Sequence, residues 1–157
     1  MNRSCGYAAV LAVVGAMALV GAPASDASRS RSVDSIHMGY YEVLRKNVIG
    51  GKVNYERLKA KSMPVVRRYQ QELADEDPNG LPWQASTSDA KLAFWLNAYN
   101  ACVIVGIVEH YPGLKSVRDI PDFFEAKRWV VHGRKLSLNE IENDIIRAQF
   151  KEPRVHL

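Results

Sequence analysis

Apolar side chains recur every fourth residue between positions 36 and 48, which is the spacing of an amphipathic helix. The glycine pair Gly50-Gly51 is expected to end this helix. A short extended piece at 53–55 then leads to a second helix, predicted from about 63 to 74, with Ser62 as its cap and a proline in its first turn. The pattern therefore predicts two helices in this part of the chain.

The longest helix is predicted after a turn at 77–80, where the sequence Asp-Pro-Asn-Gly is typical of a type I turn. Ser86 or Ser88 should cap this helix, which runs to about His110. Apolar residues occupy every side of it, so we expect it to be central and buried. Polar side chains interrupt it too soon for a membrane span.

The C-terminal part of the chain predicts a β-hairpin and one more helix. The segments 129–132 and 135–136 flank Gly133-Arg134, an arrangement typical of a hairpin. The next four residues, Ser137-Leu138-Asn139-Glu140, form a capping box that starts a helix. Residues 154–157 begin another strand, and the sequence stops there. We interpret this as a C-terminal truncation of the domain, and the alternative is a short closing edge strand.

The first 24 residues have the features of a secretory signal peptide. A positive charge precedes an uncharged apolar run at 8–20, and Ala22-Pro23-Ala24 offers a cleavage site. An uncleaved membrane anchor is the alternative, although the apolar run is short for a bilayer. Residues 25–32 resemble a polar linker, which leaves 33–157 as one domain. We therefore expect an exported protein, periplasmic or extracellular.

The charge gives little sign of a polyanionic partner. The formal net charge is +4, and removal of the signal peptide takes away one arginine and leaves +3. Lysines and arginines are spread along the chain rather than gathered in a stripe, so no nucleic-acid partner is expected. Membrane contact is expected only through the signal peptide before its cleavage.

Cys102 is the only cysteine left after that cleavage, so the exported chain should have no internal disulfide. It is a buried thiol, an intermolecular partner or a nucleophile. The apolar neighbours Val103, Ile104 and Val105 favour the buried thiol. Such surroundings raise the pKa of a thiol, which makes it a poor nucleophile.

Two asparagines interrupt the central apolar helix in the stretch FWLNAYNAC, residues 94–102. Asn97 and Asn100 are three residues apart and therefore lie on one face of a helix. A buried amide costs about 1–3 kcal/mol for each group without a partner. Either the asparagines form a structural network with backbone groups, which is the usual role of buried amides, or they orient a ligand or stabilise an oxyanion.

Several segments together resemble one known family. They are GGKVNYERLKA, AFWLNAYNACVIVGIVEHYP, KSVRDI, LSLNEIENDIIR and EPRVH, and the resemblance extends from about Val33 to Leu157. On these motifs the chain is identified as a C-terminally truncated member of the domain of unknown function 547 family. The resemblance implies a papain-like or transglutaminase-like α+β fold, in which a helical lobe with a buried central helix packs on a small antiparallel sheet.

The resemblance also implies where a site would lie. His156 matches the family histidine, Arg154 the arginine before it, and Glu142 a glutamate in the helix after the capping box. The catalytic candidates are therefore His156, Asn97, Asn100 and Glu142, and the substrate-binding candidates are Trp95, Tyr99 and Arg154. Plainer alternatives are an ion pair of Glu142 with Arg147 or Arg154, and a core position for the aromatic residues.

The three remaining histidines are expected to be structural or solvated, because no metal-ligand spacing surrounds them. His37 is predicted at a surface-facing helix position, His110 at a helix C-terminus and His132 in the hairpin. The sequence contains no H-E-x-x-H, phosphate-binding loop, dinucleotide-binding fingerprint or EF-hand loop. We therefore expect neither a metal nor a cofactor.

Folds of this kind host a cysteine nucleophile paired with a histidine on a strand. In the family, the segment after the histidine carries the cysteine, and this sequence stops before it. If the full-length family is catalytic, we expect acyl transfer or amide hydrolysis, and no activity from this chain. The alternative is a non-catalytic envelope module that binds a peptide or protein partner, since one fold hosts many functions.

Overall fold

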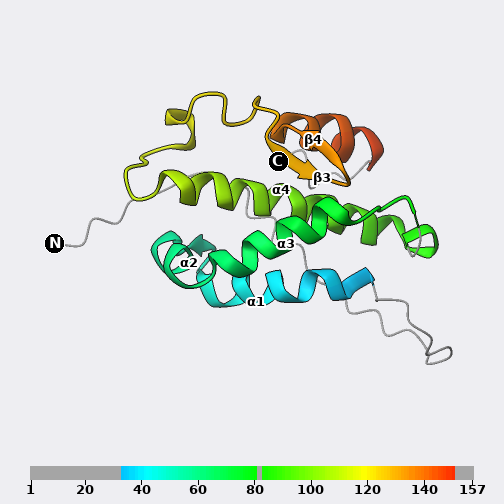
Figure 1. Ribbon diagram of the computed structural model, residues 1–157, viewed down its shortest axis with the longest axis horizontal. Coiled ribbons are helices and arrows are strands. Elements are labelled where there is room, and N and C mark those ends of the chain that lie inside the picture. Colours follow the sequence, from blue (N-terminus) through cyan, green and yellow to red (C-terminus); the bar gives the residue numbers. More distant parts are fainter. Residues whose placement is uncertain (1–32, 81–82, 151–157) are drawn as a thin grey trace.

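The computed structural model describes residues 33–80 and 83–150 as a mostly helical chain with two short β-hairpins (Figure 1). The elements in chain order are η1 (Val33–His37), α1 (Met38–Asn47), β1 (Val48–Ile49), β2 (Lys52–Val53), α2 (Tyr55–Lys61), α3 (Met63–Asp75), η2 (Trp83–Ala85), α4 (Ser88–His110), η3 (Val117–Asp119), β3 (Trp129–Val131), β4 (Arg134–Leu136) and η4 (Glu140–Arg147). The expected α+β class is confirmed.

Helix α4 is the centre of the molecule. Every residue from 101 to 108 is buried, because α3 and η4 both pack on this helix. Figure 1 shows α4 running between α1–α3 on one side and the β3–β4 hairpin with η4 on the other. Its N-cap is Thr87, whose hydroxyl accepts a hydrogen bond from the Ala90 N–H. The predicted caps, Ser86 and Ser88, are each one position away. The prediction of a buried central helix is confirmed.

Among the described residues, α4 is also the one helix long and apolar enough to cross a membrane by length and composition. In its most apolar window, 67% of the residues are buried inside the molecule. A core helix that packs against neighbours on all sides has this same composition. The packing of α4 therefore accounts for its hydropathy.

Gly50 and Gly51 form the turn of a hairpin rather than the end of a helix. Their φ angles are +56° and +74°, values that glycine adopts without a steric cost and that two-residue hairpin turns require. The register pairs Val48 with Val53 and Ile49 with Lys52. The expectation of a helix end was wrong, because a glycine pair occurs equally well at the end of a helix and in the turn of a hairpin.

Helix α2 was not predicted, because an extended piece was expected at 53–55. Asn54 caps this helix by accepting a hydrogen bond from the Arg57 N–H at 2.9 Å. Ser62 precedes α3 as expected, but its side chain does not cap that helix. Its Oγ instead accepts a hydrogen bond from Asn47 Nδ2 at 3.0 Å, which joins the end of α1 to the start of α3.

The second hairpin was predicted in the right place, but its turn is at residues 132 and 133 rather than at Gly133-Arg134. Trp129 pairs with Leu136, Val130 with Lys135 and Val131 with Arg134. Trp129 and Val131 are buried against the helices, whereas Val130 between them points outward and is 49% exposed. At the turn, the backbone N–H groups of residues 132 and 133 donate to carbonyls at the C-terminal end of α3, so the hairpin is fixed to that helix.

The capping box at 137–140 is also confirmed. Ser137 Oγ accepts from the Glu140 N–H at 3.1 Å, and the Glu140 carboxylate accepts from the Ser137 N–H at 2.9 Å. The helix that it starts is π-helical over Glu140–Arg147. Since a π-helix bonds residue i to residue i+5, side chains five residues apart come close together on it.

An ion cluster joins α3, α4 and the β3–β4 hairpin. Glu109 near the end of α4 accepts from Arg67 of α3 at 2.7 Å, and its other oxygen pairs with Arg128. The Arg128 guanidinium also lies over the Trp129 ring, 4.3 Å from its centroid. Partial burial opposes the charge on Glu109, but hydrogen bonds from the two arginines outweigh it and hold the pKa of this carboxyl below its usual value.

Candidate functional site

Asn97 and Asn100 lie on a half-buried face in the first half of α4. Within residues 33–80 and 83–150, neither side-chain amide takes part in a hydrogen bond. The structural amide network expected at these positions is therefore not formed by the described part of the chain. Each carboxamide carries two donors and one acceptor oxygen, so this face offers unused hydrogen-bonding capacity.

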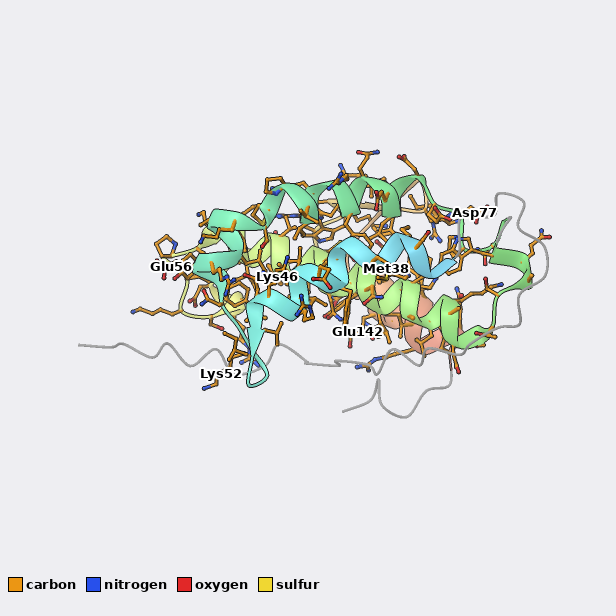
Figure 2. All side chains as sticks on the ribbon, turned by 90° about the horizontal axis from the view of Figure 1, so that it is seen from below. Met38, Lys46, Lys52, Glu56, Asp77 and Glu142 are labelled. Carbon is orange, nitrogen blue, oxygen red and sulfur yellow. The ribbon has the colours of Figure 1, made fainter. Side chains whose placement is uncertain are left out.

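Glu142 of η4 lies against the same half of α4 (Figure 2). Tyr99 Oη donates to one carboxylate oxygen at 3.1 Å, and Arg147 Nη2 donates to the other at 2.7 Å. Of the two ion-pair partners expected for Glu142, Arg147 is thus the one found. Burial, and then the negative charge of Glu142, raise the pKa of Tyr99, so that the phenol stays protonated and donating.

The π-helical winding explains how Arg147 reaches Glu142. In an α-helix, residues five apart point about 140° away from each other around the axis. In the π-helical η4 they come closer together, because its wider turns bond residue i to residue i+5. The amphipathic pattern of the sequence does not indicate a π-helix, so it could not predict which of the two arginines pairs with Glu142.

The polar groups follow one another around α4. At 3.6 residues per turn, Asn97 is about 60° from Asn100, and Asn100 is about 100° from Tyr99. Asn100 therefore lies between the other amide and the Tyr99–Glu142 pair. The half-exposed side chains of Ala93 and Leu96 border this face. Neither was predicted there, because small and apolar residues in a central helix look like core in a sequence.

The other site candidates fall elsewhere. Trp95 is 4% exposed and packs edge-on against Phe94, with 5.3 Å between the ring centroids. Trp95 therefore lies in the core, which is the alternative position considered for the aromatic residues. His156 and Arg154 lie outside the described residues, so their roles stay predictions.

Cys102 is a core thiol, which confirms the favoured interpretation. It is 2% exposed, and burial raises its pKa to about 12 although a hydrogen bond with Gln70 opposes the shift. The thiolate is the nucleophilic form of cysteine, and at neutral pH this residue holds almost none of it. The described residues contain no other cysteine, so they provide no thiol nucleophile.

The position of His37 corrects one expectation. It was predicted to face the surface, but it is 5% exposed and its Nδ1 lies 2.6 Å from Tyr69 Oη. His37 precedes the buried Tyr40 by three residues, so helical spacing puts it on the same buried stripe as Tyr40 and Val43. His110 and His132 both contact backbone carbonyls. In the described ranges, no group of three or more His, Cys, Asp or Glu could hold a metal.

Comparison with known proteins gives one match. Residues 83–157, slightly less than half of the chain, match the model of the family described as "Protein of unknown function, DUF547". The match supports membership of the DUF547 family. It starts later than the resemblance, which was expected from about residue 33, but it contains Asn97, Asn100 and Glu142. No curated protein and no solved structure matches the chain.

The DUF547 description assigns no activity, so the function has to be argued from the residues. On the described residues, the candidate site is the polar face of α4 with Asn97 and Asn100, bordered by Tyr99, Glu142 and Arg147. Its groups donate and accept hydrogen bonds. This chemistry suits the holding of a polar ligand.

Proposed function

We propose that this protein is an exported binding module, which holds an extended segment of a peptide or protein partner against the polar face of α4. The observation that carries the proposal is the pair of half-buried amides, Asn97 and Asn100, that no described residue engages. Asparagine is a poor helix former, so two of them without a structural partner weaken the central helix. A ligand that uses them accounts for their presence.

The spacing of the two amides suits a peptide main chain. Side chains three residues apart on a helix have Cβ atoms about 5–6 Å apart. In an extended peptide, groups that point the same way repeat about every 6.6 Å, since each residue rises about 3.3 Å. A carboxamide matches the N–H and C=O of a peptide group with its own acceptor and donor. Two alternate residues of a bound peptide would therefore meet Asn97 and Asn100.

The Tyr99–Glu142–Arg147 group would border the ligand at one end. Both carboxylate oxygens of Glu142 are already engaged, so its charge is neutralised locally. Tyr99 Oη donates to Glu142 and keeps a lone pair with which it could accept a ligand N–H. Recognition by amides and a phenol reads the main chain rather than charged side chains, so we expect weak dependence on peptide sequence.

The proposal can be tested by NMR on the isotope-labelled chain with the blocked peptide acetyl-Ala-Ala-Lys-Ala-Ala-amide. Addition of the peptide should shift the side-chain amide signals of Asn97 and Asn100. The signal of Asn47 should stay in place, because this buried amide donates to Val43 O at 2.7 Å and to Ser62 Oγ. Affinity for so short a ligand is expected to be weak, about millimolar.

Two controls make the result decisive. The same peptide with N-methyl groups on alternate residues lacks the donors that the carboxamide oxygens need, and it should bind at least several-fold more weakly. Asn97→Ala and Asn100→Ala should reduce binding of the parent peptide, whereas Asn79→Ala, in an exposed turn, should not. Equal binding of both peptides, or no shift at Asn97 and Asn100, would overturn the proposal.

Export rests on the N-terminal sequence, which lies outside the described residues. An apolar run followed by Ala22-Pro23-Ala24 supports cleavage after residue 24. Mass spectrometry of the protein recovered from expressing cells should find a chain that starts at Ser25 in the exported fraction. An intact N-terminus in the cytoplasmic fraction would contradict export.

A second candidate function is acyl transfer on the papain-like architecture that the family resemblance implies. The observation that favours it is the carboxylate of Glu142, which Tyr99 and Arg147 hold against the helix that also carries Asn97 and Asn100; these amides would polarise a carbonyl. In this case His156 would act as general base or acid. Turnover of a thioester by the purified chain, abolished in His156→Ala and reduced in Asn97→Ala, would favour catalysis over binding.

A further inference from the structure

The positive charge of the chain is concentrated in one segment. Residues 45–61 contain six basic residues and one acidic residue, a net of +5, whereas the whole chain carries +4. The remaining residues therefore sum to −1. The even spread that the sequence suggested is wrong for this segment. Its basic residues are all exposed, and they are Arg45, Lys46, Lys52, Arg57, Lys59 and Lys61.

The fold gathers this segment at one end of the molecule. It comprises the end of α1, the β1–β2 hairpin and α2, and the Asn54 N–H donates to Asn47 O at 2.8 Å across the base of the hairpin. Figure 2 shows Lys46, Lys52 and Glu56 at the same end of the protein, with the hairpin that carries Lys52 projecting from the helices. The charge is thus presented on a protrusion.

The tip of this protrusion is apolar. Ile49 is 66% exposed, more than any other large hydrophobic side chain among the described residues. It pairs across the hairpin with Lys52, and only two glycines separate them in the chain. An exposed apolar side chain flanked by basic ones is the combination that binds at the interface of an anionic membrane.

Several of the basic groups remain free to act outside the protein. Arg45 and Lys46 share Glu42, and Lys59 donates to a backbone carbonyl. Lys52, Arg57 and Lys61 form no ion pair within the described ranges. These three side chains, with Ile49, supply charge and apolar surface that no internal contact uses.

We propose that the β1–β2 hairpin and its basic flanks form a docking surface for an anionic lipid bilayer. The lysines and arginines would lie over the head groups, and Ile49 would enter the boundary with the acyl chains. Each basic residue near an anionic surface strengthens binding about fivefold. Nucleic acid fits less well, since it is bound through phosphate contacts and aromatic stacking, and the tip offers isoleucine instead of an aromatic ring. This inference is independent of the peptide-binding proposal.

The β3–β4 hairpin provides a matched control, because Val130 and Lys135 repeat the pairing of Ile49 with Lys52. Both apolar residues and both lysines are exposed. We would compare I49S/K52E with V130S/K135E in the full chain, so that residues 1–24 contribute equally to each. Sedimentation with vesicles of equal parts phosphatidylcholine and phosphatidylglycerol measures binding, and circular dichroism confirms that each variant is folded.

The expected result is binding to the mixed vesicles but not to pure phosphatidylcholine. I49S/K52E should weaken it by more than about 25-fold, since the charge at one position changes by two units and the apolar contact of Ile49 is lost as well, and V130S/K135E should leave it within about twofold. R57Q/K61Q, which changes no tip residue, should also weaken it, by about 25-fold.

Equal losses in the two hairpin variants would mean a general charge effect and would overturn the proposal. So would equal binding to both kinds of vesicle. Binding of a single-stranded oligonucleotide that follows the same variants, without vesicle binding, would assign the surface to nucleic acid instead. As a separate check, the fluorescence of an I49W variant should shift to shorter wavelength on mixed vesicles, and no shift would show that the tip stays in water.

Discussion

Replacement of asparagines by alanine separates a structural role from a binding role in α4. If Asn97 and Asn100 serve a ligand, their loss should not destabilise the free protein. Asn47 is the matched control, because it is 0% exposed and its Nδ2 donates both to Val43 O at 2.7 Å and to Ser62 Oγ at 3.0 Å. All three positions are helical, so the same substitution reports three different environments.

The expected changes differ in sign. At Asn97 and Asn100 no described hydrogen bond is lost, and alanine is the better helix former by about 0.6 kcal/mol. Each substitution should therefore raise the free energy of unfolding by about 0.5 kcal/mol. Asn47→Ala removes two hydrogen bonds, each worth about 1 kcal/mol; after the same gain in helix propensity it should lower the free energy of unfolding by about 1.5 kcal/mol. A residue that is kept at the expense of stability is typical of a functional position.

Urea unfolding followed by circular dichroism measures all three variants against the parent chain. The shift in the midpoint at unchanged slope gives the change in the free energy of unfolding. A loss of more than about 1 kcal/mol in Asn97→Ala or Asn100→Ala would show that the amide has a structural partner. The reasoning for a binding face on α4 would then fail, whatever the peptide titrations show.

Three further predictions concern the core around α4. Glu109→Gln should lower the free energy of unfolding by about 1 kcal/mol at pH 7, whereas the exposed control Asp144→Asn should not. Because the folded-state pKa of Glu109 is lowered, its contribution is present above the unfolded pKa and should vanish as the pH falls below about 4.5. A pH-independent difference in urea midpoints would refute the ion cluster. Cys102 should resist a thiol reagent in the native protein and react after unfolding, and rapid native labelling at pH 7 would contradict its burial. Gly106→Ala should destabilise by about 1 kcal/mol despite its better helix propensity, because the new Cβ would lie 2.7 Å from the Phe123 ring; a higher melting temperature would show that the ring moves aside.

The predictions from local patterns were correct where neighbouring residues alone determine the structure. The capping box at 137–140, the hairpin around residue 133 and the apolar α4 all follow from neighbouring residues. The errors occurred where one pattern has two outcomes. Gly50-Gly51 ends a helix or turns a hairpin, and only the pairing of the flanking residues decided for the hairpin.

The candidate site was predicted in part. Asn97 and Asn100 were chosen from their place in an apolar helix, and helical spacing alone predicts that they share one face. Whether they have structural partners depends on what packs against that face, which involves residues far away in the chain. The expected amide network is not found among the described residues, and no local rule could have shown this.

Composition and short-range spacing were enough to predict that α4 is buried, that Cys102 is a poor nucleophile and that a helix starts after residue 137. Contacts in the folded chain were needed to place His37 inward, to pair Arg147 with Glu142, and to gather the basic residues of 45–61 around an exposed Ile49. Each of these depends on how helices wind and where they pack, and both properties are set by contacts between segments distant in the chain.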